Sequence, residues 1–109
     1  MLMKEIYKLH AEICKVFSNP TRLEILNLLR DGEMSVAKLM IDSKLSQANI
    51  SQHLSIMKSR GIVDSERNGK NVYYRLSNPR IIKAFDIIKE VLSERLEKSN
   101  KLFNGVVAK

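Results

Sequence analysis

Apolar side chains near the N-terminus recur three and four positions apart, which is the spacing of one face of an α-helix. This spacing predicts a first amphipathic helix from Glu5 to Phe17. Asn19 and Pro20 then predict the start of a second helix, because Asn is favoured as an N-cap and Pro at the first helical position. We expect the second helix to end at Gly32 and to be mostly buried, since its aliphatic residues are Leu23, Ile25, Leu26, Leu28 and Leu29.

Two serines predict the starts of the next two helices. Ser35 is expected to cap a short helix that reaches Met40, and residues 42–45 are expected to form a turn. Ser46 is expected to cap a longer helix that runs to about Arg60. A short helix, a tight turn and a second helix form a helix-turn-helix unit. The buried edge of its second helix is predicted to be Ile50, Leu54 and Met57.

After Gly61 the apolar positions alternate, which is the pattern of β-strands. The strands are expected at 62–67 and 72–76, joined by Asn68-Gly69, because that dipeptide suits a turn with positive φ at both positions. Asn78-Pro79 predicts the start of a last helix, whose apolar stripe is Ile81, Ile82, Phe85, Ile88, Val91, Leu92 and Leu96. The fold class is therefore mainly α, with five helices and a small β-hairpin wing: a single winged helix-turn-helix domain over residues 1–109, frayed from about residue 100 as a basic tail.

The charge of the chain is distributed unevenly. The 109 residues carry a formal net charge of +7. Residues 1–43 contribute none of it, residues 44–79 contribute +4, and residues 80–109 contribute +3, as a solvated helix with a basic tail would. The excess in the middle segment coincides with the second helix of the helix-turn-helix and the hairpin. A polyanion is therefore the first partner to test.

The second helix of the helix-turn-helix has the composition of a DNA-reading surface. Its predicted outward face holds small hydroxyl and amide side chains, and the helix has no acidic residue. Asn and Gln can pair with adenine edges, and Ser can bond either base type, so this face suits a major groove. An ordinary solvated face has a similar composition, but the basic hairpin that follows favours DNA. The predicted DNA-contacting residues are Ser46, Gln47, Ala48, Asn49, Ser51, Gln52, Ser55, Lys58, Arg67, Asn68 and Lys70.

Three stretches of the sequence resemble the ArsR/SmtB family of small winged-helix repressors. They read FSNPTRLEILNLL, SQANISQHLSIMKSRGIV and ERNGKNVYYRLS. The resemblance implies a homodimer, built from the first and last helices, that blocks transcription at a palindromic operator and releases it when an effector binds. It also implies that residues 47–49, 51 and 52 face the DNA. The expected dimer interface includes Ile6, Leu9, Ile13, Phe85, Ile88 and Leu92.

The metal-binding residues of that family are missing from this chain. Ser35 and Ala37 stand where its metal sensors place thiolates, and neither can bind zinc. The last helix offers carboxylates but no His, and carboxylates alone make a poor site for a transition metal. We therefore expect no metal and no other cofactor. The resemblance leaves the effector, if there is one, unknown.

The remaining reactive side chains give no sign of catalysis. His10 is interpreted as an amphipathic filler near the dimer stripe, and His53 as packed on the third helix or touching a phosphate. Cys14 is the one redox-capable group, and a buried, inert thiol is favoured over a sensor or a bridge between two copies. Arg22 and Glu24 are interpreted as a structural pair. No nucleophile with a base and no Gly-rich phosphate loop is recognisable, so an enzyme is not expected.

The sequence favours a protein of the cytoplasm and leaves one rival function open. No apolar run approaches the roughly 20 residues that span a bilayer, so no membrane is involved. The N-terminus resembles neither a signal nor a transit peptide, and a single cysteine suits a reducing cytoplasm. The rival is a winged-helix protein-interaction module with only non-specific DNA affinity. Acidic residues on the recognition face would favour that rival, and the sequence has none there.

Overall fold

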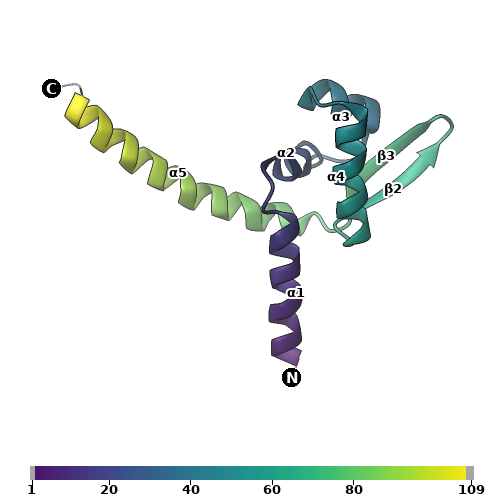
Figure 1. Cartoon of the computed structure of the whole chain (residues 1–109), viewed down its shortest axis with the longest axis horizontal. Coiled ribbons are helices and arrows are strands. Elements are labelled where there is room, and N and C mark those ends of the chain that lie inside the picture. The colour runs from purple at the N-terminus through teal and green to yellow at the C-terminus, as the bar shows by residue number, and fades with distance from the viewer. Residues whose placement is uncertain (1, 108–109) are drawn as a thin grey trace. The chain divides into compact units, whose positions relative to one another are not determined.

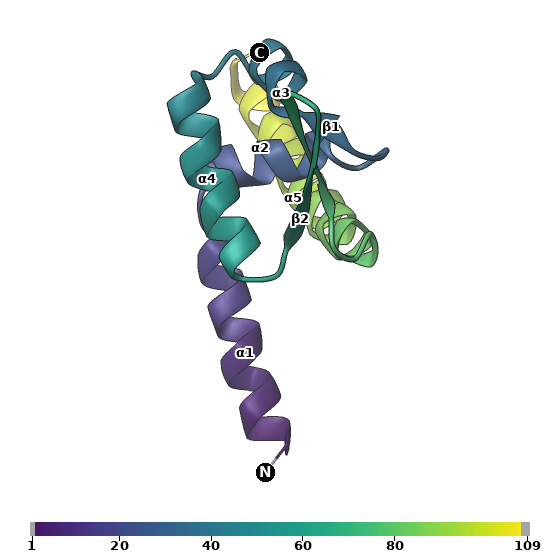
Figure 2. The ribbon, with the colours of Figure 1, turned by 90° about the vertical axis from the view of Figure 1, so that its right-hand side faces the viewer.

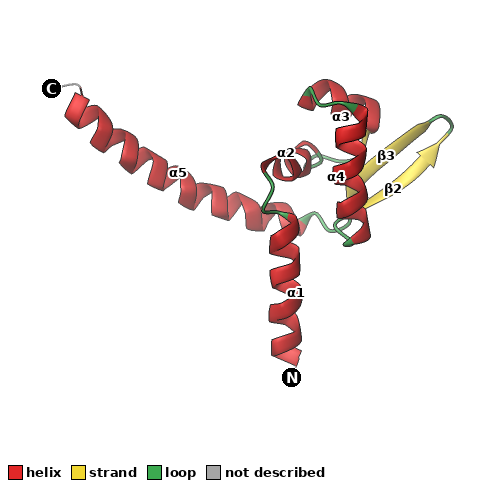
Figure 3. Cartoon of the chain, in the orientation of Figure 1, coloured by secondary structure: helices red, strands yellow, loops and turns green. Residues whose placement is uncertain are grey.

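The computed structural model describes residues 2–107, with side chains up to Asn100. It divides into two units, one that ends at Asn78 and one that begins at Pro79. Within the described residues there are five helices and a β-hairpin, as predicted (Figures 1 and 3). None of the described helices is both long and apolar enough to cross a membrane.

Four helices lie in the first unit, and the last three begin where the sequence predicts. Asn19, Ser35 and Ser46 are their N-caps, and each side chain accepts hydrogen bonds from backbone N–H groups of the first turn. Those N–H groups have no partner inside the helix, so the caps fix where each helix starts. The bounds are α1 Leu2–Val16, α2 Pro20–Leu28, α3 Val36–Ser43 and α4 Gln47–Ser59.

The ends of α2 and α3 differ from the prediction. α2 stops at Leu28 rather than Gly32, because tighter turns follow, in which the backbone N–H groups of Arg30 and Gly32 donate to carbonyls three residues earlier. α3 continues past Met40 to Ser43. It is closed by Lys44, whose φ of 62° lies in the left-handed region. This single left-handed residue makes the tight turn between α3 and α4.

Three antiparallel strands form a small sheet in the order β1-β3-β2. β2 and β3 are the predicted hairpin. β1 was not predicted, because a strand of two residues has no periodicity, and it forms only by pairing with β3 far along the chain. The bounds are β1 Met34–Ser35, β2 Val63–Asn68 and β3 Asn71–Leu76.

The hairpin turn is one residue later than predicted. Asn68 pairs with Asn71, so the two central residues are Gly69 and Lys70. Gly69 has a φ of 64°, while Lys44 is the only described non-glycine residue with positive φ. A turn with positive φ at its first central position alone is of type II′, which also matches the twist of the strands. The predicted Asn68-Gly69 turn is therefore wrong, and the register instead keeps the buried residues of both strands on one face.

The core of the first unit lies between its helices and the sheet. In Figures 1 and 2, α2, α3 and α4 gather beside the hairpin, while α1 extends away from them. Leu23 was predicted to be buried but is 37% exposed. The buried side chains of this unit are Val16, Phe17, Ile25, Leu26, Leu29, Leu39, Ile50, Leu54, Met57, Ile62, Val63 and Leu76.

The second unit is a single long helix. α5 spans Arg80–Val107 and begins directly after Asn78-Pro79, as predicted. Its backbone is helical beyond residue 100, where the sequence suggested a frayed tail, and no proline interrupts the sequence between 80 and 107. Residues 108 and 109 of that tail lie outside the described residues.

Candidate nucleic-acid interface

The exposed side of α4 carries the polar residues that the sequence places there. Ile50, Leu54 and Met57 are each 0% exposed and fix which side of the helix faces inward. The opposite side is solvent-exposed, and no acidic residue occurs on this helix. We call these exposed residues the recognition face: Gln47, Ala48, Asn49, Ser51, Gln52 and Ser55.

The wing, which is β2, β3 and the turn between them, has two different faces. Successive side chains of a strand point to opposite faces, so the inner face that holds the buried Val63 also holds Arg67. The two acidic residues of the wing, Asp64 and Glu66, lie on the outer face. There Arg75 donates from a terminal nitrogen to Glu66 Oε2 at 3.4 Å. The inner face is therefore free of acidic groups.

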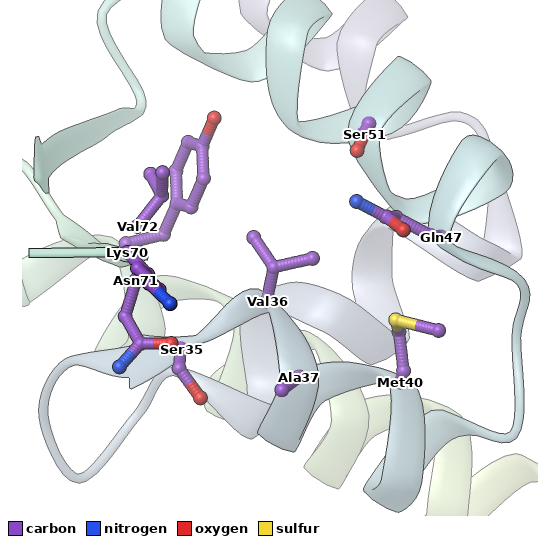
Figure 4. A pocket seen from close by; sticks show the side chains of 10 residues that line it. Ser35, Val36, Ala37, Met40, Gln47, Ser51, Lys70, Asn71 and Val72 are labelled. Atoms are coloured by element: carbon purple, nitrogen blue, oxygen red, sulfur yellow. The ribbon is translucent and has the colours of Figure 1, made fainter.

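A hollow of about 310 Å³ joins the recognition face to the wing (Figure 4). Lys70 and Asn71 of the wing lie on one side of it, and Gln47 and Ser51 of α4 lie on the other. Side chains of β1, α3 and β3 line the rest of it, mostly with apolar atoms, and the sequence did not reveal this part because it depends on how the elements pack. Those further lining residues are Ser35, Val36, Ala37, Met40, Val72 and Tyr74.

Two predicted contact residues are held by the protein itself, and a third lies away from the hollow. The Ser46 hydroxyl caps α4 by accepting a hydrogen bond from the backbone N–H of Asn49 at 3.2 Å. The Lys58 ammonium donates to Ser65 Oγ at 2.6 Å and so ties the last turn of α4 to β2. Asn68 lies on the outer face of the wing. The other predicted contact residues are exposed.

His53 and Arg22 form a contact that the sequence did not predict. Arg22 Nε donates to His53 Nδ1 at 3.2 Å, and a terminal nitrogen of Arg22 donates to the backbone carbonyl of Val16, also at 3.2 Å. Burial, and secondarily the guanidinium of Arg22, lower the pKa of His53, so its imidazole is neutral near pH 7. The interpretation of Arg22 and Glu24 as a pair was wrong, because the guanidinium turns toward α1 and α4.

The other reactive groups do not form a site. Cys14 is exposed on the single chain, so the expected burial of its thiol was wrong for one chain. His10 on the same helix is also exposed. Among the described residues, no three His, Cys, Asp or Glu side chains converge to hold a metal ion.

The expected dimer residues lie on apolar faces of two helices. On α1, Ile6 and Leu9 are 52% and 59% exposed. On α5, Ile88 and Leu92 are also exposed. Ile13 and Phe85 are half-buried, and further apolar side chains are exposed on the same helices: Leu2, Met3, Ile87, Val91 and Leu96.

Known proteins are similar to this chain in sequence and in structure. The family of bacterial regulatory proteins called the arsR family matches residues 19–65. An HTH-type transcriptional regulator of Methanocaldococcus jannaschii is 39% identical over 88 residues, which are 80% of this chain and 99% of that protein.

Solved structures agree with the sequence relatives. The solution structure of a homodimeric winged helix-turn-helix DNA-binding domain from Mycobacterium bovis, a possible ArsR-family regulator, has a TM-score of 0.77 at 29% identity, covering 88% of this chain and 89% of that one. The transcriptional repressor BigR from Xylella fastidiosa has a TM-score of 0.70 at 31% identity, covering 79% and 88%. The chain therefore belongs to the ArsR family of winged helix-turn-helix transcriptional regulators, which are DNA-binding proteins and not enzymes.

Proposed function

We propose that this protein is a repressor that binds a palindromic DNA operator as a homodimer. The observation that carries the proposal is the acid-free surface formed by the recognition face and the inner face of the wing. Amides and hydroxyls on α4 supply base-edge contacts in a major groove, while Arg67 and Lys70 supply cations for the phosphate backbone. The hollow between them has room for part of a DNA strand.

The apolar faces of α1 and α5 support the homodimer. Several large aliphatic side chains on each helix are about half exposed or more in the single chain. Contiguous exposed apolar residues on a soluble domain commonly mark a protein interface. The domain from Mycobacterium bovis, similar over most of this chain, is described as homodimeric. A second copy of this chain is therefore the occupant we propose.

A dimer explains how so small a domain achieves selectivity. A single recognition helix, which is α4, contacts few base pairs. Two such helices about 34 Å apart read two half-sites that are one turn of DNA apart. An effector would then act by changing the geometry between subunits, because a small rotation spoils this spacing. The expected compartment is the cytoplasm, where the DNA of a bacterium or archaeon lies.

Fluorescence anisotropy with two duplexes tests this function. One duplex comes from upstream of the protein's own gene, and the other is its scrambled sequence. A dimer that makes about six to ten phosphate contacts should lose roughly 10³ to 10⁵ in affinity between about 50 and 200 mM salt. We expect the preference for the native duplex to persist at the higher salt concentration, because base contacts are less sensitive to salt than phosphate contacts.

The rival function predicts a different result. A winged-helix module that binds another protein would bind both duplexes equally and only through salt-sensitive contacts. Equal binding, repeated with duplexes from the neighbouring promoters, would contradict the proposed repressor and favour the protein-interaction module.

A further inference from the structure

One side chain, that of Arg22, joins three helices of the first unit. It extends from the first turn of α2. Its Nε bonds His53 on α4, and a terminal nitrogen bonds the carbonyl of Val16 at the end of α1. The three residues come from different helices, and both contacts are partly buried. A single guanidinium thus connects α1 to the recognition helix directly.

The contact with α1 is placed where that helix is attached to the rest of the unit. Val16 is the one buried residue of α1. Its carbonyl lies in the last turn of the helix, where carbonyl groups have no hydrogen-bond donor inside the helix. A cation at this end also interacts favourably with the helix dipole. Arg22 therefore holds α1 at its only buried turn.

The contact with α4 is placed beside the DNA-reading residues. His53 follows Gln52 of the recognition face directly. Its Nδ1 can accept from Arg22 only while it carries no proton. The lowered pKa of His53 agrees with this neutral state.

We propose that Arg22 is a positioning residue that couples α1, the helix proposed to form the dimer, to the recognition helix, and so sets the spacing at which two recognition helices meet DNA. The inference rests on the proposed function. The planar fork of Arg can satisfy acceptors on two elements at once, whereas an ammonium acts as a point charge. Arg22 is not one of the predicted DNA-contacting residues, and it lies outside the recognition face and the wing.

The surroundings of this contact make it sensitive to pH. A hollow of about 340 Å³ beside it is lined by the charged groups Glu12 and Lys15 of α1, Arg22 of α2 and Arg60, which follows the last residue of α4. Cations predominate there. A proton on His53 would remove the acceptor and add a further positive charge next to the guanidinium. The coupling therefore requires neutral imidazole and is lost as the pH falls.

Operators of altered spacing test the coupling. We compare a duplex with the native half-site spacing and one with a single extra base pair between the half-sites. Arg22→Met keeps the apolar stem but removes every donor. Arg60→Met makes the same change in the same hollow at a residue exposed to solvent. We expect Arg22→Met to reduce the preference for native spacing about tenfold, within the range of measured couplings between sites, and Arg60→Met to keep it, with both proteins still dimeric.

Two results would overturn the inference. Arg22→Met could keep the wild-type preference for native spacing, or it could weaken binding to both duplexes by the same factor, as a purely structural residue would. A wild-type protein with no preference for any operator would instead contradict the proposed function itself, so the two failures are distinguishable.

Variants of His53 test the same coupling independently, in case Arg22→Met does not fold. Asn places an amide oxygen close to the position of Nδ1 and has no proton to gain, so His53→Asn should keep the spacing preference at about pH 7.5 and at about pH 5.5. The wild type should lose this preference at the lower pH, and His53→Leu should lack it at both. A wild-type preference in His53→Leu, or a wild-type pH profile in His53→Asn, would contradict the coupling.

Discussion

Individual side chains of the interface are suited to different kinds of DNA contact. Gln52 presents an amide on the recognition face, where it can form a paired hydrogen bond with one base. Lys70 presents an ammonium at the tip of the wing, where it can approach a phosphate but reads no sequence. Losing the first should reduce specificity, and losing the second should reduce affinity for all DNA.

Alanine substitutions separate these two roles. Gln52→Ala should weaken binding to the operator by about 1 to 3 kcal/mol and leave binding to scrambled DNA unchanged. Lys70→Ala should weaken both and reduce the slope of log affinity against log salt by about 1. Anisotropy titrations measure both effects, with Lys98→Ala as a control because it removes the same charge from an exposed position on α5. Wild-type affinity in both variants would show that the assigned surface does not meet DNA.

His53 links stability to pH. Its pKa is lowered in the folded protein from an ordinary value of 6.5, so the unfolded chain takes up this proton more readily. The contribution of His53 to the free energy of unfolding is therefore full above that value and declines as the pH falls toward the lower pKa of the folded state. Urea denaturation at about pH 7.5 and about pH 5.5 should show a smaller decrease for His53→Asn than for the wild type. Equal decreases would mean that His53 does not contribute.

Sequence reasoning placed single residues well where helix geometry alone decides their direction. The buried edge and the exposed face of α4 follow from its 3.6-residue period. The contact between Arg22 and His53 could not be predicted from the sequence, because the two residues are 31 positions apart and only the packing of α2 on α4 brings them together. The exposure of Cys14 was missed for a similar reason: nothing local shows that almost all of α1 is exposed in a single chain.

At the scale of elements, the sequence predicted where helices start. It predicted the hairpin of the sheet but neither β1 nor the position of the hairpin turn. Asn19, Ser35 and Ser46 specify helix starts through hydrogen bonds within their own first turn. β1 exists only through its pairing with β3, and the turn at Gly69 is set by the register of two strands. Features that depend on distant partners leave little trace in a short stretch of sequence.

The turn between α3 and α4 offers a stabilising substitution. Lys44 closes α3 with a φ of 62°, a conformation that is unfavourable for residues with a Cβ by about 1 to 2 kcal/mol. Lys44→Gly removes that cost but makes the unfolded chain more flexible, which offsets about 0.4 to 1 kcal/mol. Chemical denaturation should therefore show a net gain of roughly 0.5 to 1 kcal/mol for Lys44→Gly. Lys44→Ala removes the charge but keeps the strained φ, and an equal gain there would contradict the conformational explanation.

At the scale of the whole molecule, large apolar side chains of α1 and α5, such as Leu9 and Ile88, are exposed in a single chain. The sequence predicted the stripes but could not show what covers them, because the partner is outside the chain. Ile88→Asp should place a charge in the proposed interface and shift the mass in solution from about twice 12.5 kDa toward the mass of one chain. Ile41→Asp is the control, since Ile41 is 70% exposed on α3, outside the proposed interface. Sedimentation equilibrium distinguishes the outcomes, and a dimeric Ile88→Asp would exclude this face of α5.

The central claim is that a dimer reads two half-sites through paired recognition helices. Hydroxyl-radical footprinting of the upstream duplex, at a salt concentration of about 200 mM that suppresses non-specific binding, tests it most directly. The account predicts two protected patches related by a two-fold axis, with centres about 10 base pairs, or one helical turn, apart. A single protected patch, or uniform weak protection along the duplex, would contradict it.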